Sequence, residues 1–128
     1  MIKNYYLALL VFSGAFSHGQ VTDLIISEYV EGSSNNKYIE VFNGTGSSVN
    51  LTDYQLNVFS NGASSPTQSV TLIGILANNT TIVYSNSSTS IYGGATTDNA
   101  AIIFNGNDAL ALYKLSTASY VDIFGVIG

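Results

Sequence analysis

The chain has 128 residues, which is the size of a single domain, and it carries three Lys or Arg residues against eight Asp or Glu residues. A formal charge of −5 repels phosphate groups, so we expect neither direct binding of nucleic acid nor docking on anionic lipid. The chain contains no Cys, so no disulfide framework is available and burial of a core must supply its stability.

The first 19 residues have the layout of a secretory signal peptide. Lys3 supplies the positive charge, residues 7–16 (LALLVFSGAF) form an apolar stretch, and small residues precede a cleavage site before Gln20. The stretch is too short for a membrane-spanning helix, which needs about 20 residues. We expect residues 1–19 to be removed on export, and residues 20–128 to form a secreted domain that does not insert into a membrane. The alternative is that the stretch is a buried first strand or a tag-like tail.

The rest of the chain consists of short strands separated by clusters of Ser, Asn, Thr and Gly. Turn signals recur about every 8–12 residues, which is typical of sandwiches and barrels. No segment has the apolar periodicity and caps of a helix. The strands expected in chain order are residues 23–30, 37–42, 54–59, 70–76, 80–84, 101–104, 109–115 and 120–126. The sequence therefore predicts an all-β fold of two packed antiparallel sheets.

Two local patterns in the second half of the chain give finer predictions. Residues 87–98 are expected to form a loop that holds a short strand near Ile91 and Tyr92. Asn105-Gly106 lies between two apolar runs, and both residues tolerate positive φ, so a tight hairpin is expected there.

Three stretches together resemble the lamin tail domain family. They are residues 24–32 (LIISEYVEG) running into 36–43 (NKYIEVFN), residues 49–56 (VNLTDYQL), and residues 104–113 (FNGNDALALY) followed by 121–125 (VDIFG). The resemblance implies an immunoglobulin-like antiparallel β-sandwich, in agreement with the strand pattern. It also implies an interaction or adhesion module of exported bacterial proteins.

The end of the chain departs from the family pattern. In the family, the segment that resembles residues 122–128 continues into a turn and a closing strand, whereas this sequence stops at Gly128. The resemblance therefore implies that the final strand is lacking and that a sheet edge is unpaired. We expect the 128 residues to be a fragment of a longer protein.

The sequence offers no nucleophilic active site. The only His is His18, within the leader, so no His remains after cleavage to activate a serine. No G-x-S-x-G motif occurs, and Lys37 and Lys114 lie in no recognisable Ser-Lys motif. We expect that the protein is not an enzyme.

Glu28 and Glu40 are the first candidate site, because they lie on consecutive expected strands. If the strands pair so that Glu28 faces Glu40, Ile26 faces Phe42, and the two carboxylates either share a proton or bind a cation. A register one residue different separates them, and directly opposed like charges are normally avoided. Both a cation site and two separate, solvated carboxylates stay open.

Calcium is the second metal hypothesis. Asn105, Asn107 and Asp108 offer oxygen ligands close together, with Asp98 and Asp53 as further donors. A full Asp-x-Asp-x-Asp-Gly loop with a distal Glu is lacking, and a turn alone explains the Asn and Gly residues. No other cofactor is expected.

Tyrosines suggest a further ligand class, because exposed rings can stack on sugars. The alternative is that they pack in the core or at its rim. The residues concerned are Tyr29, Tyr38, Tyr54, Tyr84, Tyr92, Tyr113 and Tyr120.

The leading functional prediction is a non-catalytic binding or scaffolding module of an exported protein, which contacts a protein, cell-surface or matrix ligand. The alternative is an accessory domain attached to an extracellular hydrolase, such as a nuclease or phosphoesterase, encoded beyond Gly128. A third hypothesis, a metal-dependent enzyme that uses Glu28 and Glu40, lacks further ligands or basic groups in the sequence.

Overall fold

Ten short strands run through residues 21–128, the part of the chain that the computed structural model describes. The expected signal peptide lies outside the described residues. Two single 3-10 turns, Leu51–Asp53 and Ser60–Gly62, flank one of the strands. The strands are β1 (Ile25–Glu31), β2 (Lys37–Asn43), β3 (Val49–Asn50), β4 (Tyr54–Phe59), β5 (Gln68–Thr71), β6 (Ile75–Leu76), β7 (Thr80–Ser85), β8 (Thr97–Asp98), β9 (Ala109–Lys114) and β10 (Ser119–Phe124).

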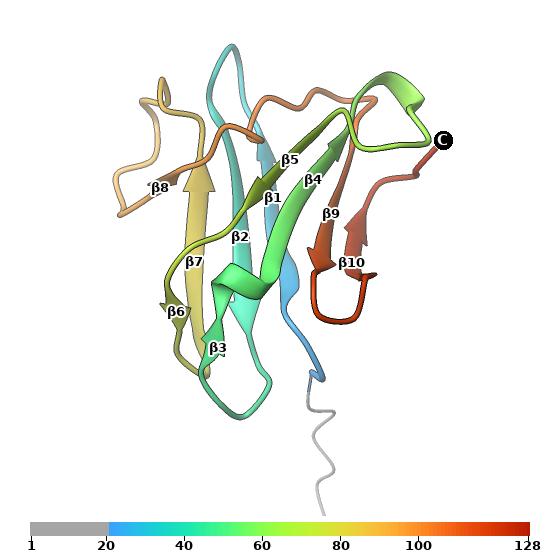
Figure 1. The fold of residues 1–128 in the computed structure, drawn as a ribbon. Coiled ribbons are helices and arrows are strands. Elements are labelled where there is room, and N and C mark those ends of the chain that lie inside the picture. Colours follow the sequence, from blue (N-terminus) through green and yellow to red (C-terminus); the bar gives the residue numbers. More distant parts are fainter. Residues whose placement is uncertain (1–20) are drawn as a thin grey trace, which may run out of the picture.

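The strands form two four-stranded sheets that face each other, in the orders β1-β2-β7-β8 and β10-β9-β4-β5 (Figure 1). The predicted all-β sandwich is confirmed, with two corrections. The short strands β3 and β6 form a separate two-stranded sheet at one end of the sandwich, and β7 pairs with β8 in parallel. All other pairs between described strands are antiparallel.

The core follows from the alternation of side chains along each strand, because successive residues of a strand point to opposite faces. Ile39 and Val41 of β2 are fully buried, and so are Leu56 and Val58 of β4. Each such burial stabilises the fold by about 1.5–3 kcal/mol. Glu40, which lies between Ile39 and Val41, points to the outer face of its sheet and is only half-buried, so a ligand can reach it.

The apolar run 101–104 is not a strand, contrary to the sequence-based prediction. It carries the chain from one sheet to the other, and Ala101, Ile102 and Phe104 are fully buried on the way. Asn99 holds this crossover: its Oδ1 accepts from the backbone N of Ala101 at 2.9 Å, and its backbone O accepts from the N of Ile102 at 3.0 Å. The apolar pattern of this segment therefore reflects the burial of its side chains, and not the pairing of its backbone with a neighbouring strand.

Because no strand precedes it, the expected tight hairpin at Asn105-Gly106 is also wrong. The turn closes with the backbone N of Asp108 donating to the O of Asn105 at 2.8 Å, and it joins the crossover to β9.

The expected strand 70–76 is divided between two sheets. β5 pairs with β4, whereas β6 pairs with β3. Gly74 lies between them with a φ of +99°, a conformation that favours glycine and redirects the chain. The short strand expected near Ile91 and Tyr92 is likewise wrong, since the strand in that region is β8.

Candidate functional site

Glu28 and Glu40 are direct neighbours on β1 and β2. This pairing, which the sequence left open, is the one that the structure shows. Ile26, however, pairs with Val41, so the expected partnership with Phe42 is wrong. The register shifts between Ile26 and Glu28, as in a β-bulge, where one strand contains an extra residue.

Ser27, the extra residue, orients one of the two carboxylates. Its hydroxyl donates to Oε1 of Glu40 at 2.7 Å and also lies 3.3 Å from the backbone O of that residue. Glu40 is half-buried, whereas Glu28 is exposed and forms no side-chain hydrogen bond with residues 21–128. One carboxylate is therefore held by the fold, and the other is free to meet a ligand.

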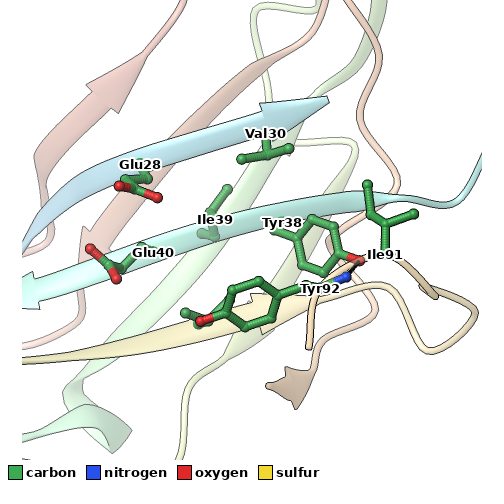
Figure 2. A pocket seen from close by; sticks show the side chains of 8 residues that line it. Glu28, Val30, Tyr38, Ile39, Glu40, Ile91 and Tyr92 are labelled. Atoms are coloured by element: carbon green, nitrogen blue, oxygen red, sulfur yellow. Dashed lines mark hydrogen bonds between the residues drawn. The ribbon is translucent and has the colours of Figure 1, made fainter. Parts of the chain in front are cut away.

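The two carboxylates line a groove of about 180 Å³ on the outer face of β1, β2 and β7. Figure 2 shows Glu28 and Glu40 side by side at one end of the groove and Ile91 at the other. The remaining wall is apolar and aromatic. The lining residues are Glu28, Val30, Tyr38, Ile39, Glu40, Val83, Ile91 and Tyr92.

The loop after β7 supplies one wall of the groove and is hydrogen-bonded both to β2 and to the residue just before it. The backbone N of Tyr92 donates to the hydroxyl of Tyr38 at 3.1 Å, and the two rings lie 5.6 Å apart (Figure 2). The backbone N of Ser90 donates to Oδ1 of Asn36 at 2.9 Å. The groove therefore brings this loop together with β1 and β2, which are distant from it in sequence.

A second hollow, of about 330 Å³, neighbours the groove. Glu40, Val83 and Tyr92 line both hollows, and Thr81, Ile82 and residues 95–97 line only the second. Glu40 and Tyr92 therefore belong to both hollows.

No lysine of residues 21–128 neutralises the groove. The side chain of Lys37 projects to the opposite face of β2, where its Nζ lies 3.8 Å from Glu31 and 5.9 Å from the centre of the Phe104 ring. Lys114 is paired with Asp23 at 2.8 Å. The groove is therefore locally acidic without an internal counter-ion from the described part of the chain.

The Asp23–Lys114 pair is a structural tie. The carboxylate of Asp23 also accepts from the Tyr54 hydroxyl at 2.6 Å and from the backbone N of Leu24 at 2.8 Å. Burial by itself raises the pKa of Asp23, but these hydrogen bonds outweigh it and lower the pKa below its usual value. The hydrogen bond to Asp23 in turn raises the pKa of Lys114. This tie joins the start of β1 to the opposite sheet.

The residues of the calcium hypothesis hold two turns together. The carboxylate of Asp108 accepts from the backbone N of Asn61 at 2.8 Å and from that of Asn105 at 2.9 Å. The amide of Asn107 donates to Oδ1 of Asn61 at 3.1 Å. These hydrogen bonds account for the residues without a metal, and calcium binding stays a prediction.

The further donors that the sequence suggested lie elsewhere, and Asp98 is in β8 of the other sheet. Asp53 lies beside the far end of β9, where its carboxylate accepts from the backbone N and the hydroxyl of Ser116 at 2.9 and 2.6 Å. Within residues 21–128 no three Asp, Glu, His or Cys side chains are grouped so that they could hold a metal ion.

The tyrosines do not form one common surface. Tyr29 stacks on Phe124 at 4.2 Å, and Tyr54 and Tyr84 are buried in the core. Tyr38 and Tyr92 line the groove. The ring centres of Tyr113 and Tyr120 lie 5.2 Å apart on the opposite sheet. The groove was missed as a whole because Ile91 and Tyr92 carry no signal in the sequence that places them beside β2.

The comparison with protein families agrees with this fold. The family model described as Lamin Tail Domain matches residues 18–128, which include every strand from β1 to β10. The resemblance found in the three sequence stretches is thereby confirmed. No curated protein matches the chain. No helix of the described residues is long and apolar enough to cross a membrane.

Proposed function

Because the chain belongs to the Lamin Tail Domain family, we propose that it is the non-catalytic binding module of an exported protein and that it holds a protein partner in the outer-face groove. Domains of this family are immunoglobulin-like, in general non-catalytic, and serve as binding or scaffold modules. The layout of residues 1–19, with a charged start and an apolar stretch, supports export.

The groove is the observation that carries the proposal. Large apolar side chains are normally buried, yet Val30, Ile91 and Tyr92 are 41%, 65% and 50% exposed around a single hollow. Exposed apolar side chains that gather at a concave site are typical of recognition surfaces. No Ser–His or Cys–His pair accompanies them in the groove, so its lining suits binding.

A protein ligand fits this surface better than a nucleic acid. Among residues 21–128, the only charged side chains that line the groove are the carboxylates of Glu28 and Glu40, which repel a phosphate backbone. A polypeptide segment can supply apolar side chains for the aromatic wall and polar groups for the rim, as in other protein interfaces.

Selection of a random peptide library on the domain tests the proposal. Val30→Trp places an indole in the groove at a position that is exposed, so the fold should tolerate it. Ile75→Trp is the matched control, because Ile75 is 76% exposed and lies in β6, away from the groove. We expect selected peptides to bind at least about tenfold more weakly to the Val30 variant, a loss of about 1.4 kcal/mol, and equally to the control. Failure to enrich peptides, or equal binding to both variants, would contradict the proposal.

The resemblance also implies a finer alternative, in which the module is an accessory domain beside an extracellular hydrolase such as a nuclease or phosphoesterase. The reading frame after Gly128 tests it. A hydrolase sequence there supports the accessory role, and an immediate stop codon contradicts it.

A further inference from the structure

Building on the proposed binding role of the groove, we infer that its ligand is a protein segment that inserts a lysine or arginine side chain between Glu28 and Glu40. The cationic head meets the two carboxylates, and the hydrocarbon stem lies along the apolar wall.

Charge is the first argument. Glu28 and Glu40 are directly opposed on neighbouring antiparallel strands, which brings the Cβ atoms of such a pair to about 4.5–5.5 Å. Like charges at this separation repel, and both lysines of residues 21–128 are paired with other acids. A cation from a partner relieves this repulsion, so the site favours a positively charged group.

Shape is the second argument. Next to the carboxylates, the groove is lined by Val30, Tyr38 and Tyr92 (Figure 2). Lysine and arginine carry three or four methylene groups that pack on apolar surfaces while the charged head stays with polar partners. The ring of Tyr92, half exposed beside Glu40, also offers a face for a cation–π contact.

Preorganisation is the third argument. The hydroxyl of Ser27 holds Glu40 through its Oε1, so that carboxylate is oriented before a ligand arrives. The wall of the groove that Tyr92 forms is likewise fixed, because the backbone N of Tyr92 donates a hydrogen bond to the hydroxyl of Tyr38. A site that is already ordered loses less entropy on binding.

A divalent cation fits the groove less well than an organic one. Calcium takes about six to eight oxygen ligands, whereas two carboxylates supply at most four. Among residues 21–128 no third acidic side chain joins the pair, and a metal ion would leave the apolar wall unused.

Titration of the ¹⁵N-labelled chain with three small probes tests the inference directly. The probes are the N-acetyl methylamides of lysine, arginine and norleucine, and norleucine keeps the stem without the charge. We expect the cationic probes to shift the backbone amides of Glu28, Glu40 and Tyr92 and to bind at least about fivefold more tightly than norleucine. Glu28→Gln and Glu40→Gln should abolish that difference, and Asp98→Asn, an exposed acid outside the groove, should keep it. Equal binding of norleucine, or shifts elsewhere, overturns the inference.

Two further outcomes separate this inference from the proposed function. If selected peptides bind the groove and Val30→Trp blocks them, but replacing their lysines and arginines by norleucine leaves the affinity unchanged, the binding role stands and the cationic ligand is wrong. If 1 mM CaCl₂ shifts the same amides in the original protein and not in the Glu28 and Glu40 variants, the pair is a metal site and the inference is overturned.

Discussion

Two acidic positions at β1 have opposite surroundings. Asp23, just before the strand, receives hydrogen bonds from Lys114, Tyr54 and a backbone N–H, so its charge is fully compensated. Glu28, within the strand, faces a second carboxylate and has no cationic partner among residues 21–128. A compensated charge stabilises a fold, whereas an uncompensated pair costs stability and is available to a ligand. The difference distinguishes a structural tie from a candidate site.

The largest expected effect is at the tie. Asp23→Ala leaves Lys114 and Tyr54 without their acceptor, and hydrogen bonds to charged groups contribute about 1.5–3 kcal/mol each. Because both partners are partly exposed, we expect a loss of about 2 kcal/mol in the free energy of unfolding at pH 7, measured by urea unfolding.

The pH dependence of the same tie is a second readout. The folded protein lowers the pKa of Asp23, so the stabilisation is present above the unfolded value of 3.8 and is lost as the pH falls through the lower folded value. The cost of Asp23→Ala should therefore shrink on acidification. An equal cost at pH 7 and at pH 2 would show that Asp23 stabilises by packing alone.

Asp108 tests whether another compensated carboxylate is structural. Asp108→Ala removes the acceptor for the backbone N–H groups of Asn61 and Asn105, and we expect a loss of about 1–2 kcal/mol in the free energy of unfolding. Thermal unfolding with and without 1 mM CaCl₂ is the control. A calcium-dependent rise in Tm that the variant lacks would favour a metal site instead.

Tyr84 shows what an uncompensated polar group does inside the core. Its hydroxyl is buried without a hydrogen-bond partner in the described part of the chain, and burial raises its pKa to about 12. We expect Tyr84→Phe to stabilise the fold by about 1 kcal/mol at pH 7, because the unpaired hydroxyl is removed. Denaturant unfolding of both proteins measures the gain, and a loss above about 1 kcal/mol would show that the hydroxyl has a partner.

Alkaline pH gives a second test of Tyr84. The folded pKa lies above the unfolded value of 10, so the folded state retains the proton and its stability falls as the pH rises between 10 and 12. The slope is about 1.4 kcal/mol per pH unit for one tyrosine. Tyr84→Phe should reduce this slope. Some slope should remain, because burial also raises the pKa values of Tyr29 and Tyr54.

The smallest expected effect is at the uncompensated pair. Glu28→Gln removes the repulsion with Glu40, and we expect a gain of about 0.5 kcal/mol in the free energy of unfolding, which decreases at high salt. Asp98→Asn is the matched control and should leave stability unchanged. A destabilised Glu28 variant would indicate that the carboxylate has an attractive partner, and the comparison with Asp23 would fail.

Part of the candidate site could be predicted from the sequence. The short connection between residues 31 and 37 favours a hairpin, and counting back from it places Glu28 opposite Glu40. On the other side of Ser27 the same counting gives the wrong pairs, because the β-bulge there shifts the register. A bulge depends on side-chain contacts, which the alternation of apolar and polar residues does not reveal. Ile26 therefore lies opposite Val41.

The sequence by itself determined the all-β class, the family and the acidity of the chain, because alternation, turn residues and charge are local properties that survive without tertiary contacts. Only the tertiary structure decided that residues 101–104 cross between the sheets and that the loop carrying Tyr92 packs on Tyr38. These two tyrosines are 54 positions apart, and their contact depends on the pairing of β2 with β7, which brings the loop after β7 beside Tyr38. The groove exists because of that long-range contact.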